Sequence, residues 1–227
     1  MVLPVEYKKD NFKKALRARW SQKMAKFPEN LSAMKGFLST DEGETLYKTA
    51  EMASKLGPIL EIGSYCGKST IYLALGCREN NKIVFTIDHH KGSEEHQVGE
   101  SFHDSDLVSP QTGEIDSFAE FRKNISSAGV EDNIVPIVAK STVVANVWQI
   151  PLAMVFIDGG HSLQAALTDY RSWSKFLLRG GFLAIHDVFE APEKGGQAPR
   201  AVHDLAINSG LFLPHMEVDS LRVLQRL

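Results

Sequence analysis

The chain has 227 residues, of which 43% are hydrophobic and 23% are charged, and its formal net charge at pH 7 is -3. This length suits one α/β domain with a sizeable core, and the small negative charge argues against a nucleic-acid-binding protein. Cys66 and Cys77 lie too far apart along one predicted helix to form a disulfide. The sequence also lacks a signal-like segment and a membrane-spanning apolar run, so we expect a cytoplasmic protein with reduced thiols and no membrane partner.

Residues 1–36 are predicted to form an N-terminal segment separate from a domain at residues 37–227. Lysines and arginines alternate there with Phe12, Leu16 and Trp20, which is the pattern of a basic amphipathic helix. Such a helix either lies across the domain with its basic face in solvent, or serves as a lid or a subunit contact. The subunit contact would give a homodimer.

A helix is predicted from Thr40 to Leu56, and the most informative stretch, PILEIGSYCGKST, follows it. This stretch begins with an apolar run typical of a buried parallel strand and continues through Gly63 and Gly67 into a helical pattern. Strand, glycine turn and helix form a cofactor site in many proteins, because the glycines let the backbone approach a ligand and the helix N-terminus offers unpaired N–H groups. The alternative is a turn that binds nothing.

The stretch differs from both better-known nucleotide motifs. The dinucleotide fingerprint requires glycine where this chain has Tyr65, and the phosphate loop requires one more residue before the Gly-Lys-Ser that begins at Gly67. A carboxylate at Glu61 would also repel a phosphate. The motif E-x-G-x-x-x-G, formed by Glu61, Gly63 and Gly67, fits a ligand with a cationic end and a ribose. That describes S-adenosylmethionine (SAM) better than ATP or NAD.

The rest of the chain alternates between strand and helix patterns. Strands are predicted at residues 82–88, 134–138, 152–157 and 182–185, and helices at about 115–127, 163–178 and 201–207. Gly180 and Gly181 are expected to cap the helix that ends near 178, and residues 211–213 and 221–227 to form antiparallel edge strands. This order predicts an α/β fold, a doubly wound, Rossmann-like and mostly parallel sheet with helices on both faces.

A polar insertion at residues 89–113 is too long for an ordinary connection, and it contains four histidines, His89, His90, His96 and His103. Their spacing matches no known zinc pattern. We therefore expect a substrate-facing loop rather than a metal cluster.

Polar residues follow the predicted strands at their C-terminal ends, where ligands bind in doubly wound folds. They are Glu61 with Gly63, Asp88, Ser141, Asp158 with His161, and His186 with Asp187. Asp88 ends the second strand, where an acidic residue hydrogen-bonds ribose hydroxyls. Asp158 and Asp187 are expected on neighbouring strands, and two adjacent carboxylates repel each other unless a cation or a proton joins them. Either a divalent cation, Mg²⁺ or Mn²⁺, binds Asp158, His186 and Asp187, or Asp158 holds a cofactor or substrate group and Asp187 caps the next loop.

The segment LEIGSYCGKS and the shorter matches after it resemble class I SAM-dependent methyltransferases. The chain is similar in particular to the catechol-type, cation-dependent O-methyltransferases of small molecules and to the group with an I-D-G-x-H-S segment. The resemblance covers residues 36–227. It implies that the methionine end of SAM is held by Leu38, Ser39, Gly63, Tyr65 and Ser69. It further implies that Asp88 binds the ribose, that Ser141 borders the adenine, and that Asp158 binds the metal beside the SAM amino group.

Three features depart from the catechol pattern, and one of them is the insertion at residues 89–113, which is longer than that family's usual connection. His186-Asp187 replaces the family's Asp-Asn pair, and His161 replaces its lysine. Asp187 can still bind a metal, and imidazole accepts a proton readily near neutral pH. We therefore predict methyl transfer from SAM to a hydroxyl of a small molecule, with His161 and Asp158 as the catalytic residues. The alternatives are methyl transfer without a metal, with His161 as the base, and a regulatory protein that binds SAM without catalysis.

Overall fold

The computed structural model describes residues 27–97, 99–100 and 102–227. The chain divides into two compact units, Met1–Ala33 and Met34–Leu227. Of the first unit the structure describes residues 27–33, which include the short 3-10 turn η1 (Leu31–Ala33). The predicted basic amphipathic helix falls on residues 1–26, outside the described part of the chain.

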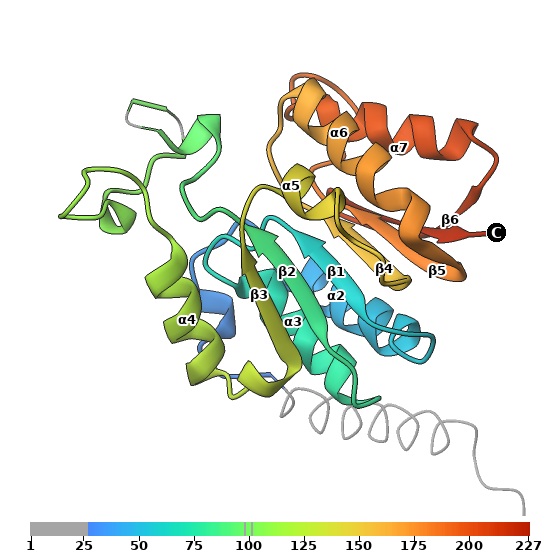
Figure 1. The fold of residues 1–227 in the computed structure, drawn as a ribbon. Helices are drawn as coiled ribbons and strands as arrows, with labels where there is room; N and C mark the ends of the chain where they lie inside the picture. The colour runs from blue at the N-terminus through green and yellow to red at the C-terminus, as the bar shows by residue number, and fades with distance from the viewer. Residues whose placement is uncertain (1–26, 98, 101) are drawn as a thin grey trace, which may run out of the picture. The chain divides into compact units, whose positions relative to one another are not determined.

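The second unit is built on a seven-stranded sheet with the strand order β3-β2-β1-β4-β5-β7-β6 (Figure 1). The strands are β1 (Ile59–Ile62), β2 (Val84–Asp88), β3 (Ile134–Val138), β4 (Leu152–Ile157), β5 (Leu177–Ile185), β6 (Phe212–Val218) and β7 (Leu221–Arg226). Strands β1 to β5 are parallel, whereas β7 is antiparallel to β5 and β6. The predicted fold class, including its antiparallel C-terminal edge, is confirmed.

Six described α-helices flank this sheet (Figure 1). They are α2 (Thr40–Ala53), α3 (Lys68–Arg78), α4 (Phe118–Ser127), α5 (Ser141–Ala145), α6 (Leu163–Trp173) and α7 (Ala198–Asn208). Helix α3 contacts α2 and α4, whereas α6 contacts α5 and α7. Because crossovers between parallel strands are right-handed, reversing the strand order between β1 and β4 places these two groups on opposite faces. Within the described residues, no helix is long and apolar enough to cross a membrane.

The helix before β5 is shorter than predicted. Helix α6 ends at Trp173, and β5 includes both Gly180 and Gly181 instead of following them. The reason is a close approach between neighbouring strands, since a Cβ on Gly181 would lie 2.6 Å from the carbonyl oxygen of Ala153 in β4. These glycines therefore serve the sheet and do not cap the helix.

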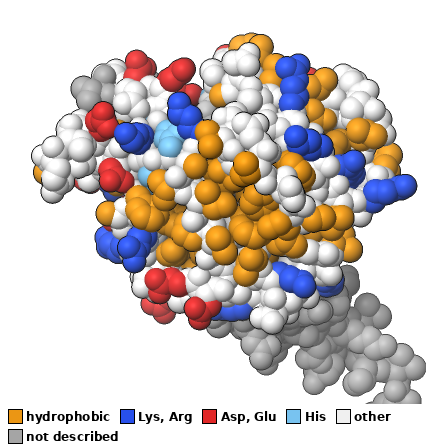
Figure 2. All heavy atoms as spheres, in the orientation of Figure 1, with side chains coloured by type: hydrophobic (Ala, Val, Ile, Leu, Met, Phe, Trp, Pro, Cys, Tyr) orange, Lys and Arg blue, Asp and Glu red, His pale blue; other side chains and the backbone are white. Residues whose placement is uncertain are grey.

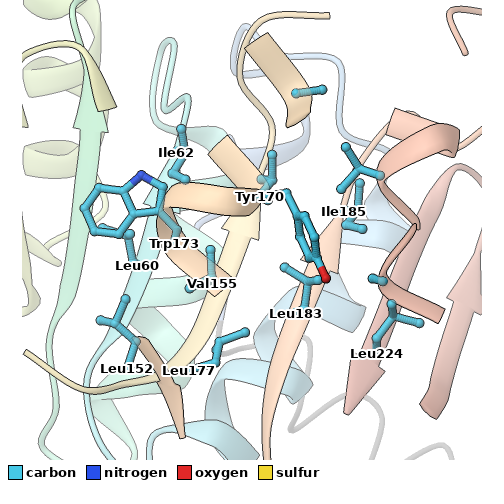
Figure 3. Packing of buried hydrophobic residues seen from close by; sticks show 14 of the residues in the cluster. Leu60, Ile62, Leu152, Val155, Tyr170, Trp173, Leu177, Leu183, Ile185 and Leu224 are labelled. Atoms are coloured by element: carbon cyan, nitrogen blue, oxygen red, sulfur yellow. The ribbon is translucent and has the colours of Figure 1, made fainter. Parts of the chain in front are cut away.

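The core lies between the middle of the sheet and α6. Every residue of β4 is buried, which accounts for the apolar run LAMVFI. Figure 3 shows Trp173 and Tyr170 of α6 packed with sheet residues such as Leu60, Val155 and Leu183. Both cysteines are free and buried. The central strand β4 is apolar along its whole length, whereas β1 and β2 each bury one polar side chain, Glu61 and Thr86.

One face of the sheet is only thinly covered. Figure 2 shows hydrophobic side chains gathered in the centre of the view, where β2, β3 and α5 lie in Figure 1. Exposed members of this region are Val135, Val138, Val143, Val147 and Ile150. The connection from β3 to β4 contains only the five-residue helix α5, which is too short to cover both strands.

Candidate active site

A cleft of about 620 Å³ lies at the C-terminal ends of β1, β2, β4 and β5. Its size suits a small-molecule or cofactor site. The predicted residues that line it are Leu38, Gly63, Tyr65, Ser69, Asp88, Ser141, Asp158, His161 and Asp187. Ser39, Glu61, Gly67 and His186 do not line it. The strand ends thus meet at one cleft, and of the four residues that do not line it, Glu61, Gly67 and His186 are buried.

Glu61 is fully buried beneath the glycine turn. Its carboxylate accepts hydrogen bonds from Ser69 Oγ (2.6 Å), Thr70 Oγ1 (2.5 Å) and Thr86 Oγ1 (2.8 Å). Burial raises the pKa of Glu61 to about 7, although these hydroxyls lower it in part. Glu61 therefore ties the start of α3 to β1 and β2, and it reaches a ligand only through the elements that it holds.

Asp88 lies at the end of β2 and closes the same turn from the other side. Its Oδ2 accepts the backbone N–H groups of Ser64 (3.0 Å) and Tyr65 (2.8 Å), and its Oδ1 accepts that of His90 (2.7 Å). A carboxylate offers about four acceptor positions, so one remains for a ligand. Asp88 fixes the shape of the turn and still lines the cleft. Its contact with a ribose stays a prediction.

The two glycines of the turn meet different steric demands. Gly63 has a φ of +85°, and a Cβ there would lie 2.1 Å from the carbonyl oxygen of Asp158. Gly67 is the left-handed N-cap residue of α3, with a φ of +87°. A Cβ there would lie 3.0 Å from the ring of Phe121. Gly63 thus allows β1 and β4 to meet at the cleft, whereas Gly67 packs against α4.

Three other predicted cofactor residues occupy different settings. Leu38 is buried and lines the cleft. Ser39 is the N-cap of α2, where its hydroxyl accepts the N–H of Glu42 at 3.2 Å. Ser141 begins α5 and donates its hydroxyl to Asp169, whose pKa is raised by burial. The hydroxyls of both serines are therefore already used within the protein.

A buried charge network lies behind the ends of β4 and β5. His186 donates from Nδ1 to Asp158 Oδ1 at 3.0 Å and from Nε2 to Glu42 Oε2 at 3.2 Å. Asp187 Oδ2 is 3.4 Å from the same Nδ1. Burial lowers the pKa of His186, but the charge of Asp158 and the hydrogen bonds to the carboxylates outweigh it and raise that pKa far above its usual range. His186 is therefore an imidazolium among three carboxylates.

Glu42 completes this network from α2. Its Oε1 accepts the backbone N–H (3.0 Å) and the hydroxyl (2.8 Å) of Ser220 in the turn between β6 and β7. Burial raises the pKa of Glu42, but the hydrogen bond from His186 outweighs this effect and the pKa falls to about 2. One glutamate thus joins α2, the end of β5 and the C-terminal hairpin.

His161 lies at the cleft surface between two carboxylates. Its Nδ1 is 3.2 Å from Glu95 Oε2, and its Nε2 is 3.2 Å from Asp187 Oδ2. The hydrogen bond to Asp187 raises the pKa of His161 to about 9, against the effect of burial. Burial acts to raise the pKa of Asp187, but hydrogen bonds from His161 and His186 outweigh it and hold that pKa well below its usual range. Asp187 adopts a left-handed backbone with a φ of +55°, as residues at functional sites often do.

The residues able to hold a metal differ from the predicted set in one member. Asp158, His161 and Asp187 each offer a ligand atom, and these atoms lie within 4.8 Å of one another. His186 does not belong to this group, because both of its ring nitrogens are bonded to carboxylates and its side chain lies behind the cleft. The structure thus groups His161, and not His186, with the two aspartates, and metal binding by either histidine stays a prediction.

The histidines of the insertion do not gather into a metal-binding group within the described residues. His90 is buried, with its Nδ1 2.9 Å from Ser117 Oγ. His96 packs against the ring of Tyr65, with 5.2 Å between ring centroids. His89 and residues 92–96 line the cleft. Part of the insertion therefore faces the site, as expected of a substrate-facing loop.

Sequence reasoning missed Glu42 and Glu95. The spacing from Ser39 to Glu42 is that of a capping box, which could have identified Glu42 as a helix-capping residue. Its bond to His186, 144 residues away, left no local signal. Glu95 gave no signal, because the insertion matches no motif and Glu95 is 66 residues from His161.

Comparison with known proteins places the chain among the methyltransferases. A family model described as "Methyltransferase domain" matches residues 60–188. Among solved structures, the chain resembles the O-methyltransferase TomG from Streptomyces achromogenes, involved in tomaymycin synthesis and solved with SAM (TM-score 0.58, 17% identity, 84% of this chain and 81% of that one). It also resembles an O-methyltransferase from Bacillus cereus in complex with SAH (TM-score 0.56, 18% identity, 94% and 90%). A third is the SAH-bound methyltransferase PaMTH1 from Podospora anserina (TM-score 0.58, 17% identity, 100% and 99%). The structures support the fold, and the family model covers more than half of the chain: the protein belongs to this methyltransferase family.

Proposed function

We propose that this protein is a SAM-dependent O-methyltransferase that acts on a hydroxyl of a small molecule with the help of a divalent cation. The observation that carries this proposal is the meeting, in one cleft, of the glycine turn with Asp158, His161 and Asp187. Family membership supports the reaction class. The solved O-methyltransferases with SAM or SAH support the cofactor and the oxygen acceptor.

The residues of the turn fit the cofactor. Only glycine is tolerated at position 63, where the backbone of β1 approaches that of Asp158, and Asp88 keeps one acceptor position towards the cleft. Leu38, Gly63 and Tyr65 would hold the methionine end, Asp88 the ribose, and Ser141 would border the adenine. When bound, SAM supplies a methyl group activated by a positive sulfur. The protein's part is to hold an acceptor oxygen in line with that methyl group.

The donor set also fits a divalent cation. Asp158 and Asp187 supply carboxylate oxygens and His161 an imidazole nitrogen, a mixture that Mg²⁺ tolerates and Mn²⁺ favours. Such a cation lowers the pKa of an oxygen acceptor and orients it. His186 neutralises part of the negative charge of the two aspartates, both of which line the cleft.

A metal-independent reaction is the second candidate, and one contact favours it. His161 lines the cleft, and its Nε2 is 3.2 Å from Asp187 Oδ2, a contact that stabilises the imidazolium formed when the ring takes up a proton. In that case His161 is the base and Asp158 only orients the acceptor. Both candidates place the acceptor beside His161, and they differ in their need for a cation.

The test is methyl transfer to a panel of phenolic and sugar hydroxyls, followed by the release of S-adenosylhomocysteine. We expect turnover with Mg²⁺ or Mn²⁺, its loss in EDTA, and its loss in Asp187→Asn. Asp132→Asn changes an exposed aspartate outside the cleft and serves as the matched control. Turnover that persists in EDTA but not in His161→Gln would replace the first candidate by the second. Failure to bind SAM would contradict both.

A further inference from the structure

The polar insertion between β2 and α4 brings an acidic side chain to the site. Glu95 lies in the 3-10 turn η2 (Glu94–His96) and lines the cleft. Both of its carboxylate oxygens lie 3.2 Å from Nδ1 of His161. Glu95 is 35% exposed and His161 30%, so the contact is partly shielded from solvent. The functions assigned above to the cleft do not use Glu95.

The turn that carries Glu95 is held by its own hydrogen bonds. Ser93 N–H donates to His96 Nδ1 at 3.2 Å and caps the turn. The side-chain amide of Gln97 donates to the carbonyl oxygens of Lys91 (3.2 Å) and Ser93 (2.9 Å). These bonds fix the backbone on both sides of Glu95, so its side chain is presented from an ordered turn.

The outer part of the insertion is anchored to the rest of the unit. Lys35 forms ion pairs with Asp104 (2.6 Å) and Asp106 (2.9 Å). Leu107 and Ile115 are buried in a small cluster with Cys66, which follows β1. The insertion is therefore tied to the segment before α2 and to the glycine turn, and these ties hold its inner part against the cleft.

We propose that Glu95 is a positioning residue that holds Nδ1 of His161 and thereby directs Nε2 of that ring towards Asp158 and Asp187. An imidazole has two distinct nitrogens, and a carboxylate beside one of them keeps a proton there and fixes the plane of the ring. Carboxylates orient metal-binding histidines in this way. This inference rests on the proposed role of His161, and it holds whether Nε2 meets a cation or a proton from the acceptor.

Glu95→Ala and Glu95→Gln test the proposal, with Glu100→Gln as the matched control because Glu100 lies exposed on the same insertion and outside the cleft. The measurement is the ¹⁵N shift of each ring nitrogen of His161, read from correlations to its ring carbon protons and assigned with His161→Gln. In the singly protonated ring we expect the proton on Nδ1 in the wild type and in Glu100→Gln, and on Nε2 in Glu95→Ala. Glu95→Gln should lie closer to the wild type, since its amide oxygen can still accept from Nδ1–H. The same proton position in the wild type and Glu95→Ala would overturn the proposal.

Titration with Mn²⁺ alone adds a second readout. We expect Glu95→Ala to weaken Mn²⁺ binding about tenfold or more, the effect usual for the loss of such a partner, while SAM binding and thermal stability stay close to the wild type. Mn²⁺ affinity equal to the wild type would contradict a positioning role. If the wild type binds no Mn²⁺, the cation-dependent function fails, and the position of the ring proton still decides the role of Glu95.

Discussion

The two halves of the cleft are held together in different ways. In the glycine-turn half, Glu61 and Asp88 bind hydroxyls and backbone N–H groups, and their partners lie within 25 residues of them in sequence. In the strand-end half, imidazoles pair with carboxylates over separations of 28, 66 and 144 residues. The first half is shaped by neutral donors and local packing, whereas the second is a long-range assembly of charges.

This difference appears in the ionisation of the two buried glutamates. Glu61 has neutral donors, and burial raises its pKa to about 7. Glu42 faces an imidazolium, and its pKa is lowered to about 2 although burial acts in the opposite direction. The pKa values of these two buried carboxylates thus shift in opposite directions, because only Glu42 has a cationic partner.

The point of contact between the halves is Gly63, and Gly63→Ala should have the largest effect. The added Cβ would lie 2.1 Å from the carbonyl oxygen of Asp158, at a φ of +85°. Overpacking and left-handed strain together should lower the free energy of unfolding by about 4 kcal/mol. Thermal unfolding and SAM titration measure the loss of stability and of binding.

Gly129→Ala is the control for backbone strain alone. Gly129 has a φ of +62°, and nothing lies within 4 Å of a Cβ placed there. Gly129→Ala should lower the free energy of unfolding by about 1–2 kcal/mol, so the difference between the two variants isolates the steric contact at Gly63. Equal losses in both would show that β1 and β4 do not depend on the close approach at Gly63.

Glu42→Ala tests whether the strand-end half depends on its charge network. Removing one partner of a buried pair leaves the imidazolium of His186 under-compensated, and we expect a loss of about 3 kcal/mol, or about 6–12 °C in Tm. Glu44→Ala, on the same helix, removes only a surface pair with Lys48 at 3.5 Å and should change stability by less than about 0.5 kcal/mol. Similar effects in both variants would contradict the network.

The pH dependence of stability tests the other half. Because the folded state raises the pKa of Glu61 from 4.5 to about 7, it binds the proton more tightly than the unfolded chain does. The contribution of Glu61 is therefore fully present below pH 4.5 and is lost as the pH rises through 7. Between pH 5 and pH 8, the free energy of unfolding of the wild type in urea should fall by about 2–3 kcal/mol more than that of Glu61→Gln. Parallel pH profiles would show that Glu61 is not protonated in the folded protein at pH 5.

Lys35→Ala should lower the stability much less than Gly63→Ala or Glu42→Ala does. Lys35 pairs with Asp104 and Asp106, but its side chain is 33% exposed, and such pairs contribute about 1 kcal/mol or less. Chemical denaturation measures this change. A loss as large as that of Glu42→Ala would mean that the insertion is a structural element of the unit rather than an attachment to it.

The sequence predicted the glycine-turn half well because its signals are local. The apolar run of β1, the turn with Gly63 and Gly67, and the acidic end of β2 follow one another within a short stretch. The mostly parallel sheet followed from the alternation of strand and helix patterns, and the antiparallel C-terminal strands were also predicted. Local signals failed at Gly180 and Gly181, which resemble a helix cap but lie within β5, where Gly180 has a φ of +77° and Gly181 closely approaches β4.

The strand-end half was predicted only in part. The chain order placed Asp158, His161 and Asp187 at neighbouring strand ends, and the structure brings them together. The chain order could not show which histidine, His161 or His186, lies at the cleft. That depends on the contact of His186 with Glu42 and on which ring lines the cleft. Tertiary packing decides both, and no local pattern encodes it.

We propose that the cleft of this methyltransferase binds SAM through its glycine-turn half and a cation through its strand-end half. Calorimetric titration of SAM, in EDTA and with Mn²⁺, tests this claim most directly. We predict micromolar SAM binding under both conditions, together with a separate Mn²⁺ heat that Asp187→Ala abolishes. An absence of SAM binding under both conditions would contradict the account, and SAM binding without any Mn²⁺ heat would remove the cation and leave His161 as the base.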